Sequence, residues 1–94
     1  MIEVHAELRV VLLEIEWNND IVSAAYDTLD AFRIERINID VDDPHVAIFE
    51  VSTIFDDDES TAETAAYCLT EDLDDAGLFA EVEVLWGEPR LNQE

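Results

Sequence analysis

The chain contains no lysine, and its 4 basic residues are all arginines. Two glycines are too few for a glycine-rich phosphate loop, and the single Cys68 excludes an internal disulfide and a multi-cysteine metal site. No apolar run approaches the roughly 20 residues that span a bilayer. The acidic start of the chain, residues 1–7, has neither the basic region nor the unbroken apolar stretch of a signal peptide. We therefore expect a cytoplasmic protein with no membrane insertion.

What the sequence has instead is a net charge of −21 together with 49% hydrophobic residues. Self-repulsion at such a charge opposes compaction, yet the apolar content is that of a chain with a core. In about 1 M salt the Debye length is roughly 3 Å, so neighbouring carboxylates scarcely repel each other. We interpret the composition as that of an extremely halophilic, archaeal protein with solvent cations at its acidic surface, and we expect it to unfold at low salt.

Few basic residues also limit the classes of partner and chemistry. Nucleic-acid affinity rests mainly on Lys and Arg contacts to phosphates, and Arg33 and Arg36 come closest to a cluster but flank Glu35. His5 and His45 lie far apart in the chain, and no Ser-centred nucleophile motif is present. The acidic run 56–59 lacks the spaced ligands and the glycine of a calcium loop. We therefore predict no nucleic-acid site, catalytic residues, cofactor or metal.

The hydrophobic pattern changes period along the chain and predicts six elements. Apolar residues at alternate positions indicate strands over 2–17, 34–41, 46–55 and 79–86. A change of phase after Val11 indicates a bulge near Val11 or Leu12, or burial of both faces there. Helical spacing predicts a helix over 19–32 and a second that follows a capping box formed by Ser60 and Glu63 and stops at Gly77. We expect one domain over 1–88 and a short tail over 89–94.

This β-α-β-β-α-β order predicts an α+β fold. Right-handed crossovers place both helices on one face of a four-stranded antiparallel sheet whose first and third strands are central. In element order, residues 2–86 resemble the ferredoxin-like group, which includes the amino-acid-binding ACT domains and many small dimeric modules. The resemblance implies a ferredoxin-like sandwich and does not by itself imply a chemistry.

The sheet face without helices is the candidate functional surface. If Ala6, Leu8 and Val10 face the helices, the other face exposes an apolar band, and such bands mark interfaces. The predicted band consists of Val11, Leu13, Val46, Ile48, Ile54 and Leu85. Arg9 and Glu50 lie on the same face, and we expect them to tune the register in which this face binds its partner. If this assignment is wrong by one residue, the band belongs to the core.

Two function classes fit this surface. The first is an association module, a homodimer or a subunit of a larger assembly that binds a protein partner through the open sheet face. The alternative is a regulatory module similar to ACT domains, which binds a small metabolite.

Overall fold

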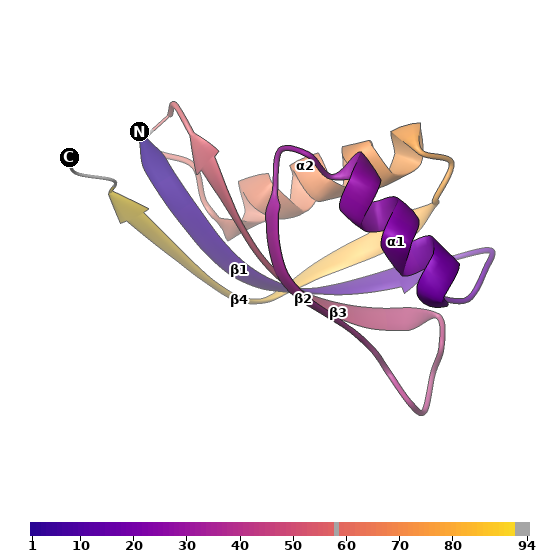
Figure 1. Cartoon of the computed structure of the whole chain (residues 1–94). Helices are drawn as coiled ribbons and strands as arrows, with labels where there is room; N and C mark the ends of the chain where they lie inside the picture. Colours follow the sequence, from indigo (N-terminus) through magenta and orange to yellow (C-terminus); the bar gives the residue numbers. More distant parts are fainter. Residues whose placement is uncertain (58, 92–94) are drawn as a thin grey trace.

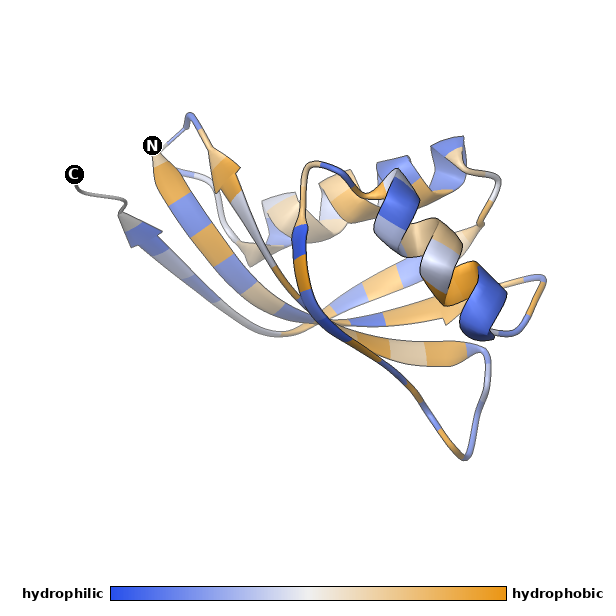
Figure 2. Ribbon diagram, in the orientation of Figure 1, coloured by the Kyte–Doolittle hydropathy of each residue, from blue (hydrophilic) through white to orange (hydrophobic). Residues whose placement is uncertain are grey.

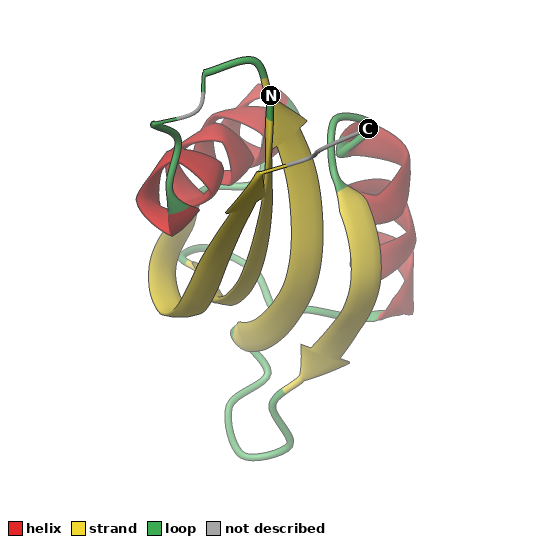
Figure 3. Cartoon of the chain, turned by 90° about the vertical axis from the view of Figure 1, so that its left-hand side faces the viewer, coloured by secondary structure: helices red, strands yellow, loops and turns green. Residues whose placement is uncertain are grey.

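In the computed structural model, which describes residues 1–57 and 59–91, two helices lie on the same side of a four-stranded antiparallel sheet (Figure 1; Figure 3). The elements are β1 (Ile2–Leu12), α1 (Asn19–Thr28), β2 (Arg33–Ile39), β3 (Val46–Phe55), α2 (Ala62–Asp75) and β4 (Ala80–Leu91). The strand order is β2-β3-β1-β4, so β1 and β3 are central. The predicted α+β fold and element order are confirmed, and the arrangement is compatible with a ferredoxin-like fold. Neither helix in this part of the chain is long and apolar enough to cross a membrane.

Alternation along β1 determines which face of the sheet is buried. The even-numbered residues from Ile2 to Leu12 are buried, and the odd-numbered ones are partly exposed, which Figure 2 shows as alternating colours along the strand. The prediction that Ala6, Leu8 and Val10 face the helices is confirmed. Because side chains of a strand point alternately to opposite faces, this pattern buries one complete face and leaves the other uncovered.

The core lies between this face and the helices. The largest fully buried side chain, Phe49 of β3, packs against Trp17 with ring centroids 5.2 Å apart. The Trp17 indole N–H donates to the Val10 carbonyl at 3.2 Å, so burial leaves its polar atom satisfied. α2 buries five residues, whereas α1 buries only Ala25, although Leu29 and Phe32 after it are also buried. The α2 side therefore supplies most of the helical cover.

Both helices differ from the prediction at one end. α1 begins as expected, with the Asn18 side chain accepting from the Ile21 N–H at 3.0 Å, but it ends at Thr28. It ends there because residues 29–32 must turn the chain into β2. The predicted capping box of Ser60 and Glu63 is wrong by one residue: Ser60 is buried, and Thr64 Oγ1 accepts from the N–H of the cap, Thr61, at 3.3 Å.

The other helix end and the first strand complete the comparison with the predicted elements. Gly77 stops α2 with a φ of +80°, as predicted, because glycine adopts this conformation without strain. The phase change after Val11 is no bulge. β1 pairs regularly with β3 through Val11 and ends at Leu12, so the predicted strand to residue 17 is too long.

β4 continues beyond its predicted end at Trp86, and Leu91 pairs with Ile2. Residues 89–91 therefore belong to the sheet, whereas the remainder of the predicted tail, 92–94, lies outside the described residues. At Gly87 a Cβ atom would overlap that of Ala62, so glycine lets β4 pass the first turn of α2. A register shift opposite Glu7 and Leu8 makes Leu85 the extra residue of a bulge.

Candidate functional site

The strand register places most of the predicted interface residues on the uncovered sheet face. Val11 lies opposite Val46, Arg9 opposite Ile48, and Glu7 opposite Glu50. Directly opposed residues of an antiparallel pair point to the same side of the sheet. Ile54 lies on this side as well, opposite Glu3.

These apolar side chains do not form a continuous band. Val46 is only 2% exposed, whereas Ile54 is 53% and Leu85 46% exposed. Along β3, Glu50 and Ser52 separate Ile48 from Ile54, because every second residue of the strand faces this side. The apolar area is thus divided by polar residues into separate anchors.

Trp86 also lies on this face, which sequence reasoning missed. Strict alternation with Val82 and Val84 would place its ring in the core, but the bulge at Leu85 shifts the register, so that Trp86 lies opposite Glu7 and is 53% exposed. A bulge adds one residue to one strand and so reverses the facing of the residues after it.

Leu13 lies elsewhere. After β1 ends, the Leu13 N–H donates to the Phe79 carbonyl at 2.9 Å, and the Leu13 side chain lines a hollow beside α2 together with Tyr67 and Phe79. The predicted placement of Leu13 on the open sheet face is wrong, because the alternation assumed for it ends one residue earlier.

All 4 basic side chains other than histidine gather on the uncovered face. Arg9 and Arg90 point to this side from β1 and β4, and Arg33 and Arg36 do so from β2. Each lies near a carboxylate: Arg9 Nη1 is 3.9 Å from Glu83, Arg33 Nε 3.1 Å from Glu35, Arg36 Nε 3.4 Å from Glu50, and Arg90 Nη2 2.8 Å from Glu88. The hydrogen bond from Arg90 lowers the pKa of Glu88. In the sequence these four arginines are scattered, and nothing in their spacing indicates that they share one face.

The charge of the chain is therefore distributed unevenly. The uncovered face carries carboxylates as well, namely Glu3, Glu7, Glu35, Glu50, Glu81, Glu83 and Glu88. Most of the 25 acidic residues lie outside this face, in the helices and loops, where there is no arginine or lysine. The uncovered face is thus the one part of the described surface where both signs of charge alternate.

The middle of the uncovered face is hollowed. A hollow of about 130 Å³ is lined by His5, Ala6, Glu7, Glu35, Glu50, Val51 and Trp86. Glu35 is the extra residue of a second bulge, in β2, so the two edge strands both bulge at the level of the Glu7–Glu50 pair. His5 Nε2 lies 2.9 Å from the Glu3 carboxylate rather than near Glu7.

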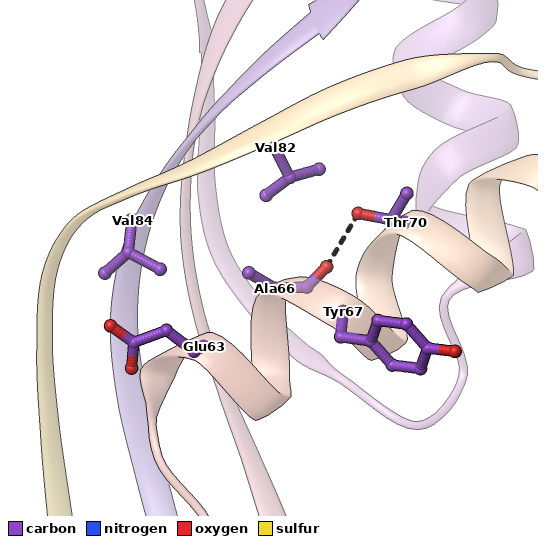
Figure 4. Close-up of a pocket in the computed structure, with 6 residues that line it drawn as sticks. All are labelled: Glu63, Ala66, Tyr67, Thr70, Val82 and Val84. Atoms are coloured by element: carbon purple, nitrogen blue, oxygen red, sulfur yellow. Dashed lines mark hydrogen bonds between the residues drawn. The ribbon is translucent and has the colours of Figure 1, made fainter.

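A second surface feature is a groove between α2 and β4, on the helix side of the sheet. Figure 4 shows Val82 and Val84 projecting from β4 towards Ala66 and Thr70 of α2, with Glu63 beside them. This part of the groove encloses about 470 Å³. The adjoining hollow of about 210 Å³ shares Tyr67 and Thr70, and its other lining residues are Leu13, Glu71, Asp74, Phe79 and Ala80.

The groove combines an apolar floor with an acidic rim. Tyr67 and Phe79 are exposed aromatic rings at its mouth. A hydrogen bond with the Glu71 carboxylate and its negative charge raise the pKa of Tyr67, which keeps the hydroxyl neutral. The rim carboxylates of Glu63, Glu71 and Asp74 have no arginine or lysine among the residues that line the groove.

The residues considered for catalysis do not meet. His5 lies on the uncovered face, whereas Cys68 is on α2, on the other side of the sheet. Burial, with the charges of Asp72 and Glu71, raises the pKa of the Cys68 thiol and so disfavours the reactive thiolate. Within residues 1–57 and 59–91, no cluster of three or more His, Cys, Asp or Glu side chains is suited to a metal ion.

Comparisons of the chain with protein-family models, with curated proteins and with solved structures found no match.

Proposed function

We propose that this protein acts by self-association, as a homodimer in which the uncovered sheet faces of two copies pack against each other. The observation that carries the proposal is the placement of all 4 arginines on this face, each beside a carboxylate. Two copies of a chain with a net charge of −21 repel each other over most of their surface. On the uncovered face, the arginines of one copy can instead attract carboxylates of the other.

The mixed charge suits a two-fold interface in particular. In a two-fold dimer the same patch is used by both copies, so each arginine of one copy needs a carboxylate on the same patch of the other. The uncovered face meets this condition because Arg36 and Glu50, and likewise Arg9 and Glu83, occupy neighbouring strands. Arginine is also enriched in interfaces, where its planar group binds carboxylates in a fixed geometry.

Apolar side chains supply the anchors. Ile54 and Trp86 are each about half exposed on this face, and Leu85, which is exposed to a similar degree, is the bulge residue next to Trp86. Tryptophan is a frequent source of binding energy in interfaces. Four strands about 4.8 Å apart and some 10 residues long at ~3.3 Å per residue give a face of roughly 19 by 33 Å. This is compatible with the ~800 Å² per partner that a standard interface buries, because side chains make the accessible area larger than the projected area.

The test is the molar mass in solution of the natural chain and of two variants, each with one aspartate substitution at a different position. Light scattering in about 1 M KCl, where surface repulsion is screened, is expected to give twice the monomer mass for the natural chain. Ile54→Asp on the uncovered face is expected to give the monomer mass. Val41→Asp, at a 96% exposed position in the turn before β3, adds the same charge and is expected to remain dimeric.

Circular dichroism of each variant checks that it is folded. A monomeric natural chain at high protein concentration, or equal loss of the dimer in both variants, would contradict the proposal.

A further inference from the structure

β4 is an edge strand in the sheet order β2-β3-β1-β4, and within residues 1–57 and 59–91 no strand pairs with its outer side. Outward backbone N–H and C=O groups of an edge strand can pair with another extended chain. The other edge strand, β2, is shorter and carries Arg33, Glu35 and Arg36, a composition that discourages pairing. β4 has 12 residues, and the groove described above runs beside it.

The side chains beside this edge differ on the two faces of β4. On the helix side, Val82 and Val84 form the floor of the groove, with Tyr67 above it. On the opposite side, Glu81 and Glu83 face outward, opposite Val11 and Arg9. A strand added here would therefore place alternate side chains in an apolar groove and beside carboxylates.

From this juxtaposition we infer that the outer edge of β4, over Ala80–Leu85, binds an extended peptide segment in which apolar and basic residues alternate. The bulge at Leu85 and Pro89, which has no backbone N–H, end regular pairing beyond this stretch. Main-chain hydrogen bonds supply affinity in such strand addition, and the alternate side chains supply specificity.

Charge decides the class of occupant. A second copy pairing through the same edge in antiparallel register would bring Glu81 and Glu83 close to their own counterparts, and like charges opposite each other destabilise a sheet. The groove rim adds Glu63, Glu71 and Asp74 without a basic neighbour among the lining residues. A basic segment of another protein would place positive charge near Glu81 and Glu83 on one side of the strand and near the acidic rim of the groove on the other.

The probe for a first test is a blocked synthetic peptide of about 8 residues with valine and lysine alternating, long enough to span Ala80–Leu85 at ~3.3 Å per residue. Its control has serine in place of valine and thus the same charge. Titrations in about 1 M KCl screen non-specific attraction to the acidic surface. The valine peptide is expected to bind at least tenfold more tightly than the serine peptide and to slow amide hydrogen exchange within residues 80–85.

Variants locate the site. Tyr67→Ser and Phe79→Ser change exposed residues at the groove and are expected to weaken binding of the valine peptide several-fold, whereas Tyr26→Ser on the exposed side of α1 leaves it unchanged. Equal binding of the two peptides, or unchanged binding in both groove variants, would overturn the inference. The measurement does not depend on dimer formation, because the molar mass is determined separately and the open sheet face is not altered.

Discussion

The uncovered face, which all four strands form, and the groove between α2 and β4 on the other side of the sheet differ in charge. On the uncovered face, Arg9, Arg33, Arg36 and Arg90 lie among carboxylates, and apolar residues are separated from one another. No arginine is among the residues that line the groove between α2 and β4, and its lining includes apolar residues of both elements. The position of the few basic residues is therefore the basis on which we propose a second copy as the partner of the first surface and a basic segment as the partner of the second.

The distribution also separates two roles of acidic residues. Several carboxylates on the uncovered face lie beside an arginine, for example Glu50 beside Arg36. Carboxylates of α2, such as Asp72, do not. Burial raises the pKa of Asp72, and the neighbouring negative charges of Asp75 and Glu71 raise it further. Since no arginine or lysine lies in the helices or loops, we expect solvent cations to screen the carboxylates on the helix side.

The largest expected effect comes from removing that screening. Lowering the ionic strength from about 1 M to about 0.01 M lengthens the Debye length from roughly 3 Å to 30 Å, so that carboxylates across the helices and loops repel each other. We expect the protein to lose its folded structure, as measured by the helical circular dichroism signal. A signal unchanged in dilute buffer would refute the assignment to a halophile and weaken the contrast between the two surfaces.

The next effect concerns the contact that positions β4 against α2. Gly87→Ala places a methyl group on the Cβ of Ala62, and overpacking of this kind is expected to destabilise the fold by ~1–3 kcal/mol. Chemical denaturation in high salt measures the loss. Ala62→Gly in the same chain removes the overlap and should recover part of it.

Gly77→Ala serves as the comparison for this prediction. Among the described residues, apart from Gly77 itself and its chain neighbours, no atom lies within 4 Å of the added methyl group, so its cost comes mainly from the φ of +80°. Ala62→Gly should therefore not rescue it. Equal rescue at both glycines would show that the contact between β4 and α2 is not the cause.

A smaller effect tests the charge pairs of the uncovered face. Arg36→Glu replaces the contact with Glu50, 3.4 Å long, by repulsion. We expect the dissociation constant of the dimer to rise about tenfold. The free energy of unfolding of the monomer should change by less than ~1 kcal/mol, because exposed ion pairs contribute little to stability. Sedimentation equilibrium measures the first and denaturation the second. Arg36→Lys keeps the charge and should keep the dimer; a dimer unaffected by Arg36→Glu would mean that this pair lies outside the interface.

Much of the fold followed from local patterns. Alternation in β1 correctly placed Ala6, Leu8 and Val10 in the core, the predicted start of α1 at residue 19 is confirmed, and Gly77 ends α2 as predicted. Errors occurred at ends of elements, as with Thr61 in place of Ser60 as the cap. At the end of a helix, neighbouring residues such as Ser60 and Thr61 have similar capping preferences, so the local sequence does not decide between them.

The candidate surfaces were less predictable. Val11, Ile48 and Ile54 were correctly placed on the uncovered face because they continue the alternation of central strands. Leu13 and Trp86 were not, since the first depends on where β1 ends and the second on a bulge. Both events are set by pairing with residues distant in the sequence, Phe79 and Glu7, which no local window contains.

The sequence by itself determined the net charge, the order of the elements and the buried face of the central strands, because composition and hydrophobic period are local properties. Only the tertiary structure decided that Arg9, Arg33, Arg36 and Arg90 share one face and that Tyr67 and Val84 border one groove. The physical reason is register: side chains from separate strands and helices become neighbours only when backbone hydrogen bonds and core packing fix how those elements align.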